Sequence, residues 1–239
     1  MPRKALSERA QAGVLDERAL DPAVALTSEI VRVMRTGRTW FNSKELRTTA
    51  MGELLKALEQ EGLARRSGSS VELLKGGRTA LAVAAIGLGA SATRISENLS
   101  PGEFEDLASR ILRAHSFKVR TRIRVRDNQG ATELDVVGWR RPRALFIDCK
   151  RWPRRTVYAN VCDRQAERVR TWGALVLHRM GVREPRAMGF PMVVTVVPGV
   201  ERMTKDCTLV GADKLNSAIQ RISDGFLDEM SVPMELSRE

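Results

Sequence analysis

Two aspartates and a lysine have a spacing that could form a hydrolytic site. Asp135 lies in the apolar sequence ELDVVG, and Asp148 and Lys150 lie two residues apart in the sequence FIDCKRW. Because side chains alternate along a strand, Asp148 and Lys150 project from the same face of an extended segment. If the two segments are neighbouring strands, two carboxylates and an ammonium group meet at one edge of a sheet.

Carboxylates in an apolar setting are unfavourable unless a cation neutralises them. A divalent metal ion does this best, and Mg²⁺ prefers oxygen ligands and keeps several waters. Asp135, Asp148 and the backbone carbonyl of Cys149 are therefore the candidate metal ligands. Lys150 is the candidate for orienting an attacking water or offsetting charge at a phosphorus atom.

These residues need a sheet to hold them, and the sequence predicts one. From Phe117 to Arg126 apolar and basic residues alternate, which is typical of a strand with one apolar side. A helix with a capping box formed by Ser100 and Glu103 precedes this strand. The further expected elements are strands over 133–138, 144–150, 192–197 and 208–210, and helices over 159–177 and 213–222. This order favours an α/β sheet covered by helices.

The preceding segment, residues 21–90, predicts helices, a hairpin over 63–74 and a closing Ala-rich helix, and it resembles a winged helix-turn-helix domain. Its third helix would expose Glu53 and Glu59, which repel phosphate, while Arg65 and Arg66 lie on the predicted wing. Dimerisation or binding of a partner protein is the alternative role. The predicted organisation is an arm over 1–20, this domain over 21–90, a linker over 91–99 and a second domain over 100–239.

Charge is concentrated in the second domain. The 239 residues carry a net charge of +11, and residues 110–155 hold 14 lysines or arginines and four acidic residues. Such a balance favours a polyanionic partner, most simply nucleic acid. A solvated edge strand is the alternative reading of the basic side of strand 117–126. The candidate DNA-binding residues are Lys118, Arg120, Arg122, Arg124 and Arg151.

Cysteine usage and hydropathy exclude several classes. Cys149, Cys162 and Cys207 have no CxxC spacing, which excludes a zinc finger and a disulfide framework and favours a reducing cytoplasm. The longest apolar run, residues 80–90, is about half of the roughly 20 residues that a membrane span requires. No membrane partner is expected.

The segments GEFEDLASRIL, ELDVVG, FIDCKRW and VVTVV resemble the PD-(D/E)xK nucleases, most closely the Mrr-type catalytic domain, over residues 98–225. The resemblance implies a restriction-endonuclease-like mixed sheet flanked by helices. It also implies Mg²⁺- or Mn²⁺-dependent hydrolysis of DNA phosphodiesters, with catalytic Glu105, Asp135, Asp148 and Lys150. Glu103 competes with Glu105 for the role of helix carboxylate, but Glu103 is already explained by the capping box.

Two other functions compete with this prediction. Archaeal Holliday-junction resolvases share the core, so a structure-specific nuclease is one alternative. A non-catalytic DNA-binding or transcription-associated protein is the other, although the intact Asp148-x-Lys150 sequence argues against it. Either nuclease favours a homodimer, because two strands need two active sites.

Overall fold

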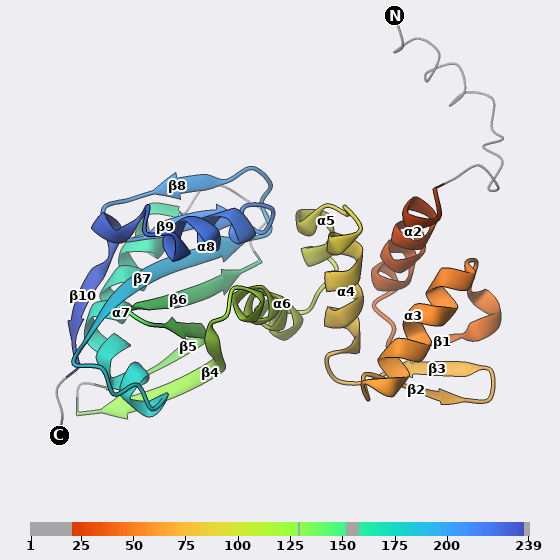
Figure 1. The fold of residues 1–239 in the computed structure, drawn as a ribbon, viewed down its shortest axis with the longest axis horizontal. Helices are drawn as coiled ribbons and strands as arrows, with labels where there is room; N and C mark the ends of the chain where they lie inside the picture. The colour runs from red at the N-terminus through yellow and green to blue at the C-terminus, as the bar shows by residue number, and fades with distance from the viewer. Residues whose placement is uncertain (1–20, 129, 152–157, 237–239) are drawn as a thin grey trace, which may run out of the picture.

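The computed structural model describes residues 21–128, 130–151 and 158–236 (Figure 1). The arm predicted over residues 1–20 lies outside this range. Figure 1 shows a small unit of helices and short strands on one side, a larger sheet with its helices on the other, and helix α6 between them.

The N-terminal unit combines three helices with a small antiparallel sheet. Its strand order is β1-β3-β2, with α2, α3 and α4 packed beside it. Asp21 caps α2 by accepting a hydrogen bond from the Ala23 amide, and Thr48 caps α3. The elements are α2 (Pro22–Arg35), β1 (Trp40–Asn42), η2 (Ser43–Glu45), α3 (Thr49–Gln60), β2 (Ala64–Ser67), β3 (Ser70–Leu73) and α4 (Gly77–Gly87). The resemblance of this unit to winged-helix proteins stays a prediction.

Residues 91–99, predicted to be a linker, are instead packed into the structure. They contain the short helix α5 (Ala92–Ser96), which is capped by Ser91. Ile95 and Leu99 are almost completely buried. The prediction was wrong here because the apolar residues are few and are spaced among polar ones, so the composition hides their burial.

The second unit is built on a mixed sheet, as the sequence predicts. Its strand order is β4-β5-β6-β7-β9-β8, and β10 pairs with β7. The pairs β4/β5 and β5/β6 are antiparallel, whereas β6/β7 and β7/β9 are parallel. The strands are β4 (Lys118–Asp127), β5 (Gly130–Arg140), β6 (Arg143–Lys150), β7 (Arg186–Thr195), β8 (Glu201–Met203), β9 (Thr208–Gly211) and β10 (Val232–Glu235).

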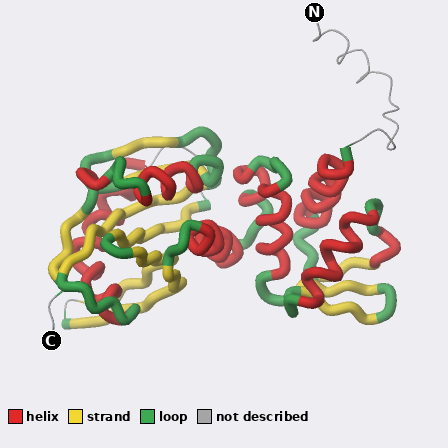
Figure 2. The backbone as a smooth tube through the Cα atoms, viewed as in Figure 1, coloured by secondary structure: helices red, strands yellow, loops and turns green. Residues whose placement is uncertain are grey.

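Helices cover both faces of this sheet (Figure 2). On one face α6 (Pro101–Ala114) contacts β6 and α8 (Leu215–Ser223) contacts β9, and both helices share a core with Leu145 and Ile147 of β6. On the other face α7 (Tyr158–Arg179) packs on Ala144 and Phe146 of the same strand. Successive residues of β6 therefore pack alternately into the two hydrophobic cores, one on each face of the sheet. A short helix, η3 (Asp228–Met230), precedes β10.

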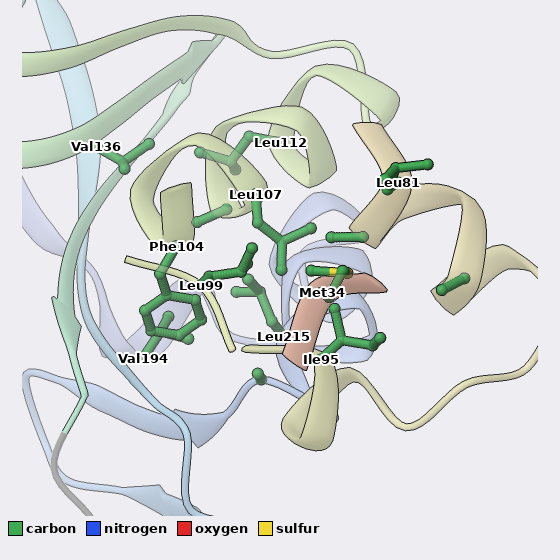
Figure 3. Close-up of a cluster of buried hydrophobic side chains, with 14 of the residues drawn as sticks. Met34, Leu81, Ile95, Leu99, Phe104, Leu107, Leu112, Val136, Val194 and Leu215 are labelled. Atoms are coloured by element: carbon green, nitrogen blue, oxygen red, sulfur yellow. The ribbon is translucent and has the colours of Figure 1, made fainter. Parts of the chain in front are cut away.

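One hydrophobic core runs from the N-terminal unit into the sheet. Figure 3 shows Met34 of α2, Leu81 of α4 and Ile95 of α5 in the same cluster as Phe104 and Leu107 of α6. The cluster continues to strands β5, β6, β7 and β9 and to α8. Helix α6 is thus buried from both sides, and the N-terminal unit packs directly against the helix that begins the second unit.

A buried ion pair joins the same two parts. Arg78 of α4 donates through Nε to Glu103 of α6 over 2.9 Å, and only 7% of the Arg78 side chain is exposed. Its guanidinium also donates to the carbonyl groups of Asn98, Arg38 and Met34. Such complete satisfaction is what a buried charge requires.

The helices do not favour insertion into a membrane. Within the described ranges, none combines the length and the apolar character needed to cross a bilayer.

Candidate active site

Asp148 and Lys150 form an ion pair at the end of β6. The Lys150 Nζ lies 2.9 Å from the Asp148 Oδ1, and the Asp148 side chain is 4% exposed while that of Lys150 is 30% exposed. Both project from one face of the strand, as the sequence predicts. The pair places a buried negative charge beside an ammonium group that reaches solvent.

Asp135 joins them from the neighbouring strand. Its Oδ2 accepts a hydrogen bond from the Cys149 amide over 2.8 Å, so β5 and β6 bring the two aspartates to one place. Burial raises the pKa of Asp135 to about 6; the Cys149 hydrogen bond lowers it, and the Asp148 carboxylate raises it. The charged form of Asp135 is therefore unfavourable without a nearby cation.

Cys149 lies between the two acids but does not supply a reactive thiolate. Burial raises the pKa of its thiol, and the nearby carboxylates of Asp135, Glu105 and Asp148 raise it further. The thiol remains protonated at neutral pH. The chemistry available at this position therefore comes from the backbone of Cys149.

The structure separates the two glutamates of α6. Glu103 accepts hydrogen bonds from the Ser100 amide and from Arg78. Its Oε2 is therefore engaged in the capping box and its Oε1 in the buried ion pair. Glu105 lies near enough to Asp135 for its carboxylate to raise the pKa of that aspartate. Glu105 therefore accompanies Asp135, Asp148 and Lys150, whereas Glu103 supports the fold.

One further cation, Arg168 of α7, reaches the same acid. Its Nη1 lies 3.5 Å from the Asp148 Oδ1 and donates to the Gln165 Oε1 over 3.1 Å. Gln165 is buried and donates to the Phe146 carbonyl, which ties α7 to β6. Arg168 is not among the residues predicted from the sequence. Its only signal is its position three residues after Gln165, on the same side of a helix.

Comparison with known proteins bears on this arrangement. Residues 96–174 match the family model of the restriction endonuclease domain Mrr_cat. Residues 96–174 therefore resemble an Mrr-type restriction endonuclease domain. The matched range covers α6, β4, β5, β6 and most of α7, and with them Glu105, Asp135, Asp148 and Lys150. The match therefore supports a nuclease, and the mixed sheet flanked by helices is consistent with a restriction-endonuclease-like fold.

Several individual proteins resemble the chain. An uncharacterized protein of Archaeoglobus fulgidus is 28% identical over 120 residues, which are 50% of this chain and 89% of that protein. Protein VC1899 from Vibrio cholerae is similar over 87% of this chain and 51% of its own, with 13% identity and a TM-score of 0.35. Can2 from Sulfobacillus thermosulfidooxidans, solved in complex with cyclic tetra-adenylate, is similar over 83% and 50%, with 15% identity and a TM-score of 0.33. The chain thus spans about half the length of these two solved structures.

The donor set of the Mrr-type domain fits a hard divalent cation. Within the described ranges, no three His, Cys, Asp or Glu side chains lie close enough together to form a metal site by themselves. Mg²⁺ does not need three, because it is commonly held by one or two carboxylates and several waters. Asp135, Asp148 and the Cys149 carbonyl are oxygen donors, and the unfavourable charge of buried Asp135 is what a cation would offset.

The basic strip of the Mrr-type domain, comprising Lys118, Arg120, Arg122 and Arg124 of β4, is largely engaged within the protein. Arg122 pairs with Glu105, and Arg124 pairs with Glu133. The side chain of Arg124 is nevertheless 83% exposed. Lys118 donates to the Met180 carbonyl, Arg120 to the Arg179 carbonyl and Arg151 to the Glu97 carbonyl. DNA binding by these residues stays a prediction.

Proposed function

We propose that this protein is a metal-dependent endonuclease that hydrolyses phosphodiester bonds in DNA. The observation that carries the proposal is the meeting of Asp135, Asp148 and Lys150 around the backbone of Cys149, inside the range that matches the Mrr_cat model. Glu105 reaches the same place from α6. Two carboxylates and a lysine on adjacent strands suit phosphoryl chemistry better than nucleophilic catalysis by the protein.

Each side chain has a distinct part in this proposal. Asp135, Asp148 and the carbonyl of Cys149 would hold the metal ion, which when bound stabilises the developing negative charge and favours ionisation of water. Lys150 donates hydrogen bonds from a partly exposed ammonium group and can orient the attacking water. Arg168 adds positive charge beside Asp148, which offsets the charge of that acid when Lys150 turns toward the substrate.

Several observations favour DNA as the substrate. The sequence carries a net charge of +11, and the excess is concentrated around the candidate site. The Mrr-type match extends over the site itself. A homodimer would present two such sites to the two strands of a duplex.

A cleavage assay on the full chain tests the proposal. Supercoiled plasmid, linear duplex, methylated duplex, single-stranded DNA and a four-way junction are incubated with Mg²⁺, with Mn²⁺ and with EDTA. We expect cleavage that requires the metal and is lost in Asp135→Asn and in Asp148→Asn, with DNA binding in EDTA retained by both. Preference for the junction would instead identify a structure-specific nuclease. Wild-type cleavage by both variants, or no cleavage of any substrate, would overturn the proposal.

A further inference from the structure

Arg122 has an unusual backbone for a residue in the middle of a strand. Within the described residues, two non-glycine residues have positive φ, Ser116 at 63° and Arg122 at 52°. Ser116 directly follows the end of α6, where a left-handed residue is common. Arg122 lies within β4 rather than at the end of a helix, so no cap explains its positive φ, which is uncommon for a residue with a large side chain. A disfavoured conformation persists only where surrounding contacts enforce it.

The strand register places this residue opposite the candidate site. Thr121 pairs with Val136 and Ile123 pairs with Leu134, so Arg122 falls across from Asp135. The left-handed backbone therefore occurs at the one point of the β4/β5 ladder that faces a candidate catalytic residue. This coincidence links the strain to the site.

The side chain of Arg122 is held by the first turns of α6. Its Nε donates to the Glu105 Oε2 over 2.6 Å, and its Nη2 donates to the Gly102 carbonyl over 3.0 Å. Asp106 lies 3.9 Å from the same Nη2. A Cβ on Gly102 would lie 2.5 Å from Nη2, so the absence of a side chain there makes room for the guanidinium. The planar fork of arginine can serve both acceptors at once, and lysine cannot.

We propose that Arg122 is a positioning residue that fixes the Glu105 carboxylate beside Asp135, an inference that rests on the proposed nuclease function. Glu105 is only 15% exposed and adds a third negative charge close to Asp135 and Asp148. Without a cation it would turn away from the other acids, because like charges repel. Arg122 neutralises it and restricts its rotamer, and the left-handed backbone aims the guanidinium at α6 rather than along the strand.

This role differs from the phosphate contact predicted for Arg122 from its place in the basic strip. If Arg122 contacts a phosphate, its removal lowers the salt dependence of DNA binding. A positioning residue acts through Glu105, so its loss lowers kcat and leaves the salt dependence unchanged. The two roles therefore separate in one set of measurements.

The first test compares Arg122→Gln with Arg186→Gln, a control that breaks an Arg–Glu pair with Glu235 outside the site. We expect kcat to fall about 10- to 100-fold in Arg122→Gln, as for residues that orient a ligand or catalytic group. KM and the salt slope of binding in EDTA should match the wild type, and Arg122→Lys should recover part of kcat. A wild-type kcat in Arg122→Gln, or a smaller salt slope with kcat unchanged, would overturn the inference.

A double-mutant cycle with Glu105→Gln tests whether Arg122 acts through that residue. If it does, Arg122→Gln should cause no further loss of kcat in the Glu105→Gln background. Additive losses would contradict the proposal. The same four proteins are unfolded by urea in EDTA, where a favourable coupling between the two residues is expected and its absence would also contradict the proposal. The unfolding measurement does not depend on cleavage, so it tests the contact between Arg122 and Glu105 even if the wild type is inactive. An inactive wild type would count against the nuclease proposal alone.

Gly102→Ala is a second variant, which tests the role of Arg122 without removing its side chain. Alanine favours the helix at this position over glycine, so the fold should be retained. Its Cβ would displace the guanidinium, and we expect kcat to fall while the melting temperature is kept or raised. A wild-type kcat in a structure where the Arg122 guanidinium has moved would overturn the inference.

Discussion

The Nζ of Lys150 lies 2.9 Å from the Oδ1 of Asp148, and the aspartate is nearly inaccessible to solvent. The lysine is therefore part of the stability of the fold as well as a candidate for catalysis. Removing one partner of a buried ion pair leaves the other charge uncompensated, which is strongly destabilising. Arg168, at 3.5 Å, offsets part of that loss.

This relationship predicts unequal effects of two substitutions. Lys150→Gln should lower the free energy of unfolding by about 1 to 3 kcal/mol, because it leaves Asp148 buried and only partly paired. Asp148→Asn should cost less, since the remaining Lys150 can reach solvent. The double variant should recover stability without recovering cleavage. Urea unfolding in EDTA gives the three values, and equal losses in both single variants would contradict this account.

The raised pKa of Asp135 predicts a pH-dependent stability. Its folded-state pKa of about 6 exceeds the ordinary value of 3.8, mainly because of burial. The protonated form is favoured in the fold, so stability is fully present below about pH 4 and is lost as the pH rises through 6. Asp135→Asn should therefore match the wild type at pH 4 and exceed it at pH 7.5, by on the order of 1 to 2 kcal/mol after allowance for partial exposure.

The comparison is made by urea unfolding in EDTA at both pH values. Mg²⁺ should raise the melting temperature of the wild type at pH 7.5 more than that of Asp135→Asn, because the variant has lost one of the two carboxylates that would hold the cation. A variant that is less stable than the wild type at both pH values would show that the Cys149 hydrogen bond outweighs burial.

The left-handed backbone of Arg122 predicts that glycine is better than alanine at this position. Glycine normally weakens a strand relative to alanine, but it adopts φ of 52° without strain. Arg122→Gly should therefore be more stable than Arg122→Ala by about 1 kcal/mol, although both lose the contact with Glu105. Thermal or urea unfolding of the two variants measures the difference. The usual order, with alanine more stable, would show that this backbone conformation carries no strain.

Much of the fold and the centre of the site follows from local pattern. Alternation of residues predicts β4, and the spacing of Asp148 and Lys150 predicts that both project from one face of β6. Ser100 and Glu103 form the capping box that the sequence indicates. These features succeed because each depends on neighbours within a few residues.

The features that the sequence did not reveal depend on distant partners. Strand β10 forms because Val232 and Met234 pair with the start of β7, more than 40 residues earlier in the chain. The contact of Arg122 with Glu105 joins a strand to a helix and requires a backbone conformation that periodicity does not predict. The burial of Ile95 and Leu99 likewise depends on packing between the two units.

The ion pair between Arg78 and Glu103 predicts that the N-terminal unit does not fold well by itself. Arg78→Met should lower the stability of the full chain by about 3 kcal/mol or more, because Glu103 loses its cation and several carbonyl groups lose their donor. A fragment of residues 20–95 should melt well below the full chain and expose the apolar side of α4. Circular dichroism with heating measures both. A cooperative fragment as stable as the full chain would show that the shared core is unimportant.

The last prediction concerns the two strip arginines that do not touch the candidate site, Arg120 and Arg124. Arg124 is 83% exposed beside Glu133, and an exposed pair of this kind contributes little to stability. Both guanidinium groups can therefore leave their present partners for a phosphate, which offers a planar, charged acceptor. Each neutralised phosphate contributes about 0.9 to the slope of log affinity against log salt concentration. Changing both arginines to Gln should lower that slope by roughly 1 to 2 and weaken binding to all sequences alike.

The measurement is DNA binding in EDTA over a salt series, and Arg186→Gln, which changes a similarly exposed arginine on β7, serves as the control. An unchanged slope would mean that the strip only protects the edge of the sheet from pairing, which is the other known use of cations on an edge strand.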